Sequence, residues 1–298
     1  MYNGIINIYK EKGFTSHDVV AKMRGICKQK KIGHTGTLDP DAEGVLPVCL
    51  GSGTKLCDML TDKDKEYVAE LLLGVETDTQ DITGQILREC ELVMDEAAVR
   101  DAVMSFCGEY MQVPPMYSAL KVNGKKLYEL ARAGKEIERQ PRPVNIHEIE
   151  ILEMQLPVVK FRVACSKGTY IRTLCADIGE KLGCGGTMKS LLRTKVGIFE
   201  LPEAITLAEL EQIRDTIGIE SKLYAVDSVF ADLETLHVAE EHCKLLDNGN
   251  AFYANQTLEK KKYPENQWIR VYGKEKFYGI YAYDQERHRY KPVKMFLQ

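Results

Sequence analysis

The sequence predicts an α+β fold, with a large N-terminal domain and a small β-rich domain at the C-terminus. Apolar residues alternate with polar ones in some segments, the period of a strand, and repeat near 3.6 residues in others, the period of a helix. Beyond about residue 230, short strand-like runs are separated by turn residues. The 298 residues are enough for one large domain or two domains of unequal size.

The first hundred residues contain patterned segments that begin and end at recognisable signals. Thr15 and the polar residues after it can cap an amphipathic helix, and Asp95 can cap a second one. Residues 45–50 are apolar enough for a buried strand or a piece of helix, and the glycines that follow favour a turn rather than a nucleotide-binding loop. The other predicted elements are strands at 4–10 and 65–74, helices at 19–24 and 96–106, and a loop at 75–84.

The run of residues 33–47 is the most informative part of the sequence. It contains three glycines, two prolines, a histidine and three acidic residues. Asp39 followed by Pro40 predicts the start of a helix, with Asp39 as the N-cap and Pro40 at the first helical position. Local chemistry alone favours a simple cap, so any further role of Asp39 has to come from the rest of the chain.

The segment from 112 to 142 combines an irregular backbone with a high density of positive charge. Two consecutive prolines exclude a regular helix over 112–121, and we expect an extended, exposed segment there. Residues 121–142 carry seven basic side chains against three acidic ones, with a helix-like centre at 126–133. We call residues 121–142 the basic insertion and expect it to project and to bind a polyanion.

The remaining elements complete the two domains. Strands at 146–152 and 158–165 precede a turn and a helix that ends near Gly183, and a helix at 207–216 closes the large domain. In the tail, the predicted strands are 252–253, 268–272 and 277–283, with turns at 248–249 and 272–273.

Composition limits the class of protein. The net charge of −4 is an average over segregated segments: residues 20–31 carry five basic groups and no acid, whereas residues 201–241 carry ten acids and two basic groups. Such segregation can place a basic face on an acidic protein, although solvated helix faces explain it equally well. No apolar run approaches the roughly 20 residues of a membrane span. Nine cysteines without a CxxC pair or zinc-ligand spacing predict reduced thiols, a cytoplasmic location and no bound metal.

Four separated segments resemble the TruB-type tRNA pseudouridine synthases of bacteria. They are residues 33–40, residues 65–67 with Gly74 downstream, residues 112–132 and residues 165–174, which follow the family's order and spacing. One such segment is weak evidence, but four in register are specific.

The resemblance implies a particular architecture. Residues 1–230 are expected to form a pseudouridine synthase domain, whose mixed, largely antiparallel central sheet is flanked by helices. An RNA-clasping insertion at about 121–145 is part of that domain. Residues 231–298 are expected to form a PUA-like RNA-binding domain.

The family converts the uridine at position 55 of the tRNA T-loop to pseudouridine without a cofactor or a metal. The C1′–N1 bond breaks, the uracil rotates, and its C5 bonds to C1′. The resemblance makes Asp39 the catalytic carboxylate, a role that suits a group able to add to an electrophilic carbon or to stabilise an oxocarbenium-like sugar. Attack on base C6, attack on sugar C1′ and deprotonation of C2′ all stay open.

The resemblance also assigns supporting residues. Arg172 is the cation beside Asp39, and Tyr67 is the aromatic side chain that stacks on the target uracil. The residues expected to hold the flipped nucleotide or the RNA are His34, Tyr170, Leu191, Lys121, Lys125, Lys126 and Arg132, with Lys10 as a weaker candidate. A lysine at position 10 is more easily explained as a surface residue.

The expected partner is the T-arm stem-loop of tRNA, bound by a monomer that needs no protein partner and no membrane. Three other functions are compatible with parts of the sequence. The chain could bind or fold RNA with Asp39 as a mere cap, act as a guide-RNA-dependent pseudouridine synthase, or hydrolyse carbohydrate with Asp39 and Asp41. The basic insertion argues against the last of these.

Overall fold

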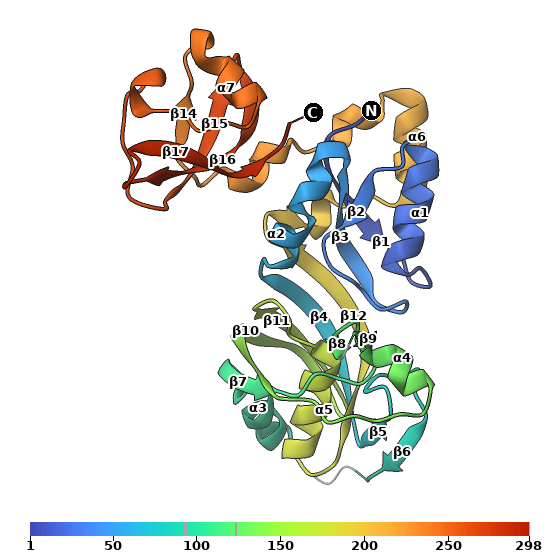
Figure 1. Ribbon diagram of the computed structural model, residues 1–298. Coiled ribbons are helices and arrows are strands. Elements are labelled where there is room, and N and C mark those ends of the chain that lie inside the picture. The colour runs from blue at the N-terminus through green and yellow to red at the C-terminus, as the bar shows by residue number, and fades with distance from the viewer. Residues whose placement is uncertain (92–94, 123, 298) are drawn as a thin grey trace.

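The computed structural model describes residues 1–91, 95–122 and 124–297. Its centre is a nine-stranded sheet with the strand order β1-β3-β12-β4-β11-β10-β7, to which β2 is added on β3 and β13 on β12. Helices lie against this sheet, and a second, four-stranded sheet stands apart at the C-terminal end (Figure 1). In the large sheet the β3–β12 pair is parallel and the other described pairs are antiparallel. The predicted α+β class with a mixed central sheet is therefore confirmed.

The strands of the large sheet match most of the predicted ones. They are β1 (Gly4–Lys10), β2 (Ile32–His34), β3 (Glu43–Leu50), β4 (Lys65–Leu73), β7 (Gly108–Gln112), β10 (Arg142–Gln155), β11 (Val158–Cys165), β12 (Gly186–Val196) and β13 (Phe199–Glu200). The apolar run 45–50, for which strand and helix were both open, lies in β3. The strands β2, β7, β12 and β13 were not predicted.

The helices follow the predicted caps. They are α1 (Ser16–Ile26), α2 (Cys57–Thr61), α3 (Glu96–Met104), α4 (Leu127–Arg132), α5 (Ile171–Lys181), α6 (Leu207–Thr216) and α7 (Cys243–Asp247). Thr15 and Asp95 are the N-caps of α1 and α3, each accepting a hydrogen bond from a first-turn backbone N–H. The predicted helix at 207–216 has the bounds of α6.

The large sheet consists of two parts that meet at a short junction. We call this the β3–β12 junction, because only two residue pairs, Leu192 with Glu43 and Arg193 with Gly44, are in register there among the described residues. On one side, β1 and β3 pack against α1 and α6. On the other side, β4, β10, β11 and β12 pack against α3 and α5. Each part therefore has its own apolar core.

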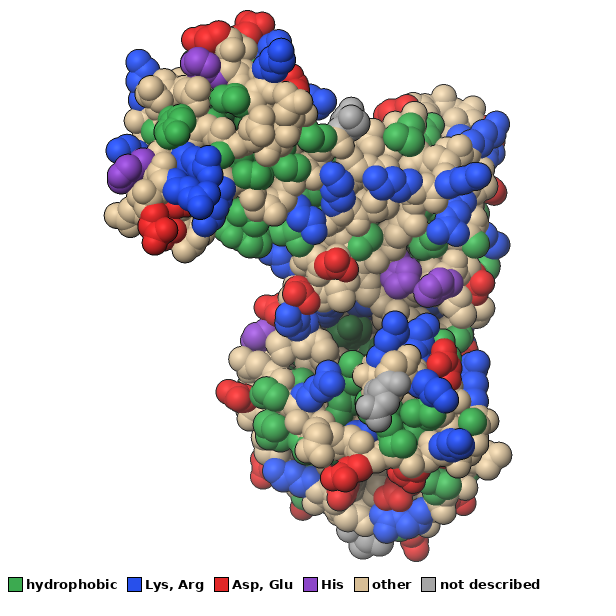
Figure 2. Space-filling view, viewed as in Figure 1, with side chains coloured by type: hydrophobic (Ala, Val, Ile, Leu, Met, Phe, Trp, Pro, Cys, Tyr) green, Lys and Arg blue, Asp and Glu red, His purple; other side chains and the backbone are tan. Residues whose placement is uncertain are grey.

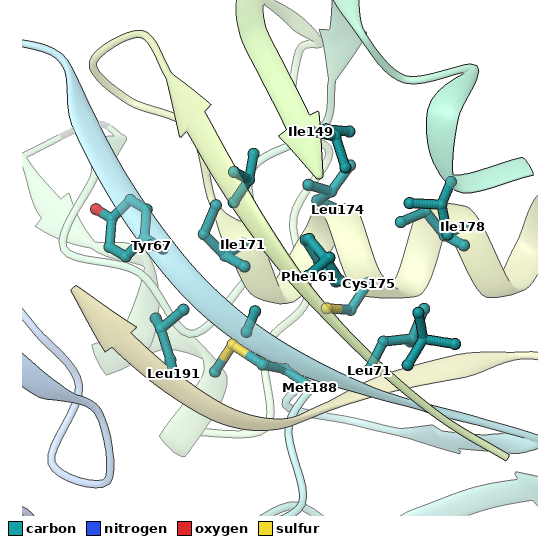
Figure 3. Close-up of a cluster of buried hydrophobic side chains, with 14 of the residues drawn as sticks. Tyr67, Leu71, Ile149, Phe161, Ile171, Leu174, Cys175, Ile178, Met188 and Leu191 are labelled. Atoms are coloured by element: carbon teal, nitrogen blue, oxygen red, sulfur yellow. The ribbon is translucent and has the colours of Figure 1, made fainter. Parts of the chain in front are cut away.

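The second of these cores extends to the junction. Figure 3 shows Tyr67 and Leu191 at one end of the cluster, with the Tyr67 hydroxyl pointing away from the other side chains. Leu38 and Ala42, from the loop between β2 and β3, are buried in the same cluster. The loop that contains Asp39 is thereby anchored in the core of the other part of the sheet.

Two small hairpins lie outside the large sheet. The predicted loop at 75–84 is partly regular, because β5 (Val75–Thr77) pairs with β6 (Ile86–Glu89). In the basic insertion, β8 (Lys121–Val122) pairs with β9 (Lys125–Lys126) and leads into α4, which confirms the helix-like centre. Residue 123 of this insertion lies outside the described residues.

The C-terminal region forms the four-stranded sheet of β14 (Thr235–His237), β15 (Trp268–Gly273), β16 (Lys276–Asp284) and β17 (Arg289–Met295). This confirms a β-rich tail, although β14 and β17 were not predicted and Phe252, in a predicted strand, forms only an isolated bridge to Tyr290. Phe230, Phe277 and Phe296 pack together where the tail meets the rest of the chain, with ring centroids 5.6–6.3 Å apart. This aromatic contact holds the C-terminal four-stranded sheet against the rest of the chain.

None of the described helices combines the length and the apolar character that crossing a membrane requires.

Candidate active site

Asp39 lies in a loop, not at the start of a helix. Its carbonyl accepts a hydrogen bond from the Ala42 N–H at 3.1 Å, which closes a turn, and β3 begins directly afterwards at Glu43. The prediction of an N-cap at Asp39 is therefore wrong. The loop is held by distant residues: the Leu38 N–H donates to the Ser16 hydroxyl at 2.9 Å.

Lys10 is a second distant residue that holds this loop. Its ammonium group donates to the carbonyls of Glu11, Pro40 and Ala42 at 3.1, 3.1 and 2.6 Å, and the side chain is fully buried. Burial lowers the pKa of Lys10 to about 8. The simpler reading of Lys10 as a surface lysine is therefore wrong, and its position fixes the turn that follows Asp39.

Asp39 forms an ion pair with Arg172. The distance from the Arg172 Nε to the Asp39 Oδ2 is 3.0 Å, and the Nη2 lies 3.5 Å from Oδ1, so the guanidinium faces both carboxylate oxygens. Arg172 is the second residue of α5 and only 7% of its side chain is exposed, whereas 39% of the Asp39 side chain is exposed. The sequence placed these residues 133 positions apart, and the fold brings them into contact.

The environment of Asp39 makes its carboxylate more basic than that of a surface aspartate. Burial raises its pKa, and the positive charges of Arg172 and Lys10 oppose that rise, while the negative charge of Asp81 adds to it. Because Asp39 does not cap a helix, no helix N-terminus stabilises its anion. Ionisation is supported instead by two fixed cations.

The guanidinium of Arg172 is itself fully occupied. Its Nη1 donates to the Thr79 carbonyl at 3.2 Å and its Nη2 to the Tyr117 carbonyl at 2.7 Å. The Nη1 also lies 3.5 Å from the Asp81 Oδ2. Arg172 is therefore held by three separate segments, and its direction toward Asp39 is fixed before any substrate binds.

Sequence reasoning missed Asp81, the second carboxylate on Arg172. Its Oδ1 accepts hydrogen bonds from the Thr79 hydroxyl at 2.8 Å and from the backbone N–H and hydroxyl of Thr83 at 3.0 and 2.5 Å. The Asp81 side chain is 14% exposed. In a loop rich in Thr, Asp and Gly, nothing in the sequence separated this residue from ordinary turn aspartates.

We expect Asp81→Asn to slow the reaction that the family resemblance implies by about tenfold, because Arg172 would lose one of its charged partners and turn less reliably toward Asp39. Single-turnover kinetics on a tRNA transcript measure the effect. Asp78→Asn is the matched control, since Asp78 Oδ1 caps only the Gln85 N–H in the same loop. Equal rates for the two variants would show that Asp81 does not orient the arginine.

Tyr67 and Leu191 reach the site from adjacent strands. Tyr67 is 8% exposed and Leu191 is 9% exposed, and both belong to the same apolar cluster (Figure 3). Burial raises the pKa of the Tyr67 hydroxyl, an effect to which the negative charge of Asp39 adds and which the neighbouring Arg193 guanidinium opposes. The Tyr67 side chain is thus uncharged and shielded from water, and it lies close enough to Asp39 for the negative charge there to raise the pKa of the Tyr67 hydroxyl.

Tyr170 is fixed by Gln112, a residue for which no separate role was predicted. The buried Gln112 side chain pairs with the Tyr170 backbone: its Nε2 donates to the Tyr170 carbonyl at 3.1 Å, and its Oε1 accepts from the Tyr170 N–H at 2.8 Å. Tyr170 is the N-cap residue of α5, two positions before Arg172. The segment after Gln112 is also more buried than predicted, since Pro114 and Pro115 are both enclosed.

His34 lies at the end of β2, against a second histidine. Its ring packs edge-on against His17 of α1, with centroids 5.4 Å apart, and its Nδ1 accepts a hydrogen bond from the Gly36 N–H at 3.3 Å. Burial lowers the pKa of His34, and the charges of His17 and Arg193 lower it further. A neutral imidazole with its Nε2–H free to donate suits contact with a nucleotide.

The basic residues of the insertion surround an aromatic ring. The Lys126 Nζ and the Arg132 Cζ lie 5.3 and 5.5 Å from the centre of the Tyr128 ring. Lys121 and Lys126 are paired across the β8–β9 hairpin, and Lys125 is exposed. Figure 2 shows basic side chains (blue) on one side of the hollow between the two halves of the molecule and histidines (purple) on the other.

The site as a whole offers carboxylate chemistry. In the described part of the chain, no cluster of three or more His, Cys, Asp or Glu side chains is arranged to hold a metal ion. What the site presents is a basic carboxylate with a fixed arginine, a buried tyrosine and an apolar wall. A group of this kind can attack an electrophilic carbon, take up a proton or stabilise a cationic sugar.

Comparison with known proteins agrees with this chemistry. Residues 24–171 match the TruB family pseudouridylate synthase (N terminal domain), and residues 172–236 match the tRNA pseudouridylate synthase B C-terminal domain. The chain is 57% identical to the tRNA pseudouridine synthase B of Lachnoclostridium phytofermentans over 99% of its own length and all of that protein. It is 49% identical to the tRNA pseudouridine synthase B of Alkaliphilus oremlandii, with 98% of this chain and 97% of the relative covered.

Solved structures show the same fold. The chain superposes on one from a Cbf5-Nop10-Gar1 complex with a TM-score of 0.74 at 26% identity, covering 98% of this chain and 84% of that one. A chain from an H/ACA RNP bound to a substrate RNA containing 2'-deoxyuridine gives a TM-score of 0.73 at 24% identity, over 99% of this chain and 85% of that one.

Proposed function

Because the chain belongs to the TruB family of pseudouridylate synthases and forms pseudouridine in tRNA, we propose that it acts on the uridine at position 55 of the T-loop, with Asp39 as the catalytic carboxylate. The ion pair between Asp39 and Arg172 is the observation that carries the residue assignment. In this pair, the partly exposed Asp39 carboxylate, whose pKa is raised, faces the Arg172 guanidinium, which stays protonated. Replacement of Asp39, described in the Discussion, tests the assignment.

The reaction requires a base that is out of its stack. A uridine inside a folded T-loop is extruded at a cost of a few kcal/mol, which stacking and phosphate contacts offset. Tyr67 stacks on the uracil, and Leu191 forms an apolar wall of the pocket. His34 and Tyr170 hold the flipped nucleotide in place. Asp39 then acts on the base or the sugar while the C1′–N1 bond breaks and the C5–C1′ bond forms.

The carboxylate role is compatible with three chemical routes. Asp39 adds to C6 of the uracil, adds to C1′ of the ribose, or removes a proton from C2′. Each route needs an ionised carboxylate, and each gains from a cation that stabilises it. The support that Arg172 gives is common to all three.

We propose that the basic insertion grips the T-arm through Lys121, Lys125, Lys126 and Arg132. These side chains lie on the hairpin and helix that follow the Tyr117 contact with Arg172. Phosphate contacts of this kind position the RNA without reading its sequence.

Removal of the charges of Lys125, Lys126 and Arg132 together is expected to weaken tRNA binding by about tenfold or more and to flatten its salt dependence, because fewer counterions are released. Binding to labelled tRNA at several salt concentrations measures both quantities. The matched control removes three basic side chains elsewhere, Lys160, Lys181 and Lys195. An unchanged salt slope in the first variant would contradict the proposed grip.

We further propose that the chain acts alone, as a cytoplasmic monomer on free tRNA. The support is its identity over nearly full length to the tRNA pseudouridine synthase B relatives. The structural neighbour from the Cbf5-Nop10-Gar1 complex raises the alternative of an enzyme that needs accessory proteins. Mass-spectrometric mapping of pseudouridine in a bare T-arm transcript treated with the pure protein separates the two, since only the first forms product.

The division into a catalytic domain at 1–230 and a PUA-like domain at 231–298 is also a proposal. The apolar core made of residues between 236 and 297 supports it, because that cluster is separate from the two cores of the large sheet. The second family match ends at residue 236, close to the start of β14. Limited proteolysis that releases a stable fragment beginning near residue 231 tests the boundary.

A further inference from the structure

A guanidinium is enclosed at the β3–β12 junction without a carboxylate partner. Arg193 on β12 is 1% exposed and is the largest of the fully buried side chains in the described part of the chain. None of the ion pairs between described residues includes it, whereas Arg172 nearby has two acidic partners. A buried, unpaired cation is costly and is retained where its hydrogen bonds do something that an apolar side chain cannot.

The hydrogen bonds of Arg193 reach both ends of the loop that contains Asp39. Its Nε donates to the Val45 carbonyl at 2.7 Å, and its Nη2 donates to the Gly36 carbonyl at 3.3 Å. Gly36 lies three residues before Asp39, and Val45 lies six residues after it. One rigid, planar group therefore sets the separation of the two ends of the loop.

The backbone around Arg193 explains why the contact is so close. Gly44 is in register with Arg193 across the junction and has φ of +104°. A Cβ added to Gly44 would lie 2.2 Å from the Arg193 carbonyl oxygen, so only glycine permits this approach of β3 to β12. The loop and the strand are thus in direct backbone contact at the position of the arginine.

Arg193 also borders Tyr67. The two residues are directly opposite in the β4–β12 register, and the positive charge of the Arg193 guanidinium opposes the rise that burial causes in the pKa of Tyr67. Tyr67 belongs to one part of the large sheet and the Asp39 loop to the other, and among the described residues the two parts are in register only at the short β3–β12 junction. Arg193 binds both ends of the Asp39 loop and lies opposite Tyr67 in the neighbouring strand.

We propose that Arg193 is a positioning residue for the reaction: it fixes the Asp39 loop relative to Tyr67 across the β3–β12 junction. This inference rests on the proposed catalytic role of Asp39. A small change in the separation of the carboxylate and the stacked base is enough to slow the reaction, because reacting groups must be held close to their attack distance. Only 1% of Arg193 is exposed, so we expect it to act through the Asp39 loop and not by binding RNA itself.

The test uses the full-length chain with Arg193→Lys and Arg193→Gln. Lysine keeps the charge, but its single ammonium nitrogen does not reproduce the planar spacing of the guanidinium nitrogens that bind the Val45 and Gly36 carbonyls. Glutamine keeps one donor group without the charge. We expect the single-turnover rate on saturating tRNA to fall at least about tenfold for both variants, with tRNA affinity changed by less than about threefold. A loss in rate without a loss in affinity is the signature of a positioning role.

Arg162 provides the matched control on the same sheet. It lies on β11, faces the opposite side, and pairs with Glu66, Glu148 and Glu150. Arg162→Lys and Arg162→Gln are expected to keep the wild-type rate even where they lower the melting temperature. Rates are measured well below each variant's melting temperature, so that the unfolded fraction does not contribute.

Three outcomes would overturn the inference. They are a wild-type rate in Arg193→Lys, a rate loss matched by an equal loss of affinity, and failure of both Arg193 variants to fold while the Arg162 variants fold, which would make the residue purely structural. Asp39→Asn measured alongside separates this inference from the proposed function. If Asp39→Asn is inactive and Arg193→Lys is fully active, only the positioning role fails; if Asp39→Asn is active, the catalytic assignment itself fails.

Discussion

Asp39→Asn is expected to abolish pseudouridine formation, with a fall in the single-turnover rate of at least about 10³-fold, while the fold and the affinity for tRNA stay close to those of the wild-type chain. Asparagine has nearly the same shape as aspartate, but it cannot add to an electrophilic carbon or take up a proton. The loop around it is held by Lys10, Ser16 and Arg193, and none of these bonds uses the Asp39 carboxylate. Pseudouridine is measured by mass spectrometry and tRNA affinity by filter binding.

Asp41→Asn is the control for this variant. Asp41 lies two residues further along the same loop, its side chain is 50% exposed, and its Oδ1 is 3.9 Å from the Lys12 Nζ. The substitution removes the same charge from the same turn but leaves the Asp39–Arg172 pair in place. Normal turnover by Asp39→Asn, or inactivity of Asp41→Asn, would show that Asp39 has been given the wrong role.

Arg172→Met is expected to lower the single-turnover rate by about 10²-fold or more and to change tRNA affinity much less. The guanidinium faces Asp39 rather than solvent, so its loss affects the carboxylate before it affects the RNA. Because the positive charge of Arg172 lowers the pKa of Asp39, its removal lets that pKa rise. The reaction needs the ionised carboxylate, so the decline of rate on the acidic side should move to higher pH.

Two further variants make this test decisive. Arg172→Lys keeps a positive charge near Asp39 and should leave the acidic decline nearer to that of the wild type, although it cannot face both carboxylate oxygens. In Arg172→Met, the Asp81 carboxylate loses the cation with which it pairs. Combining Arg172→Met with Asp81→Asn removes that unpaired negative charge as well. A loss confined to affinity, with an unchanged rate and pH profile, would make Arg172 a phosphate contact instead.

Much of the fold followed from local patterns. The caps at Thr15 and Asp95, the apolar run of β1, the alternation in β4, β10 and β11, and the period of α6 each depend on neighbouring residues, and each was predictable. The same reasoning failed at Asp39-Pro40, where a cap residue followed by proline satisfies every local rule for a helix start. Bonds from Lys10, Ser16 and Arg193, all distant in sequence, hold the segment as a loop instead.

The candidate site was predictable only where a motif identified it. Asp39, Arg172, Tyr67 and Leu191 came from the resemblance, and the fold brings Asp39 against Arg172 and Tyr67 beside Leu191. The predicted site residues did not include Arg193, although it lies two positions after Leu191 and therefore faces the same side of the strand. A charged residue at a core-facing position of a strand is a signal, but β12 itself had not been predicted.

The contact between Arg172 and the Tyr117 carbonyl affects which substitutions the chain can accept near the site. The 2.7 Å bond uses a backbone oxygen, which no side-chain substitution at residue 117 removes. Gln112 fixes the start of the same segment through its two bonds to Tyr170. The path from 112 to 118 is therefore constrained by the arginine, whereas none of the bonds that hold Arg172 in the described part of the chain comes from the basic insertion.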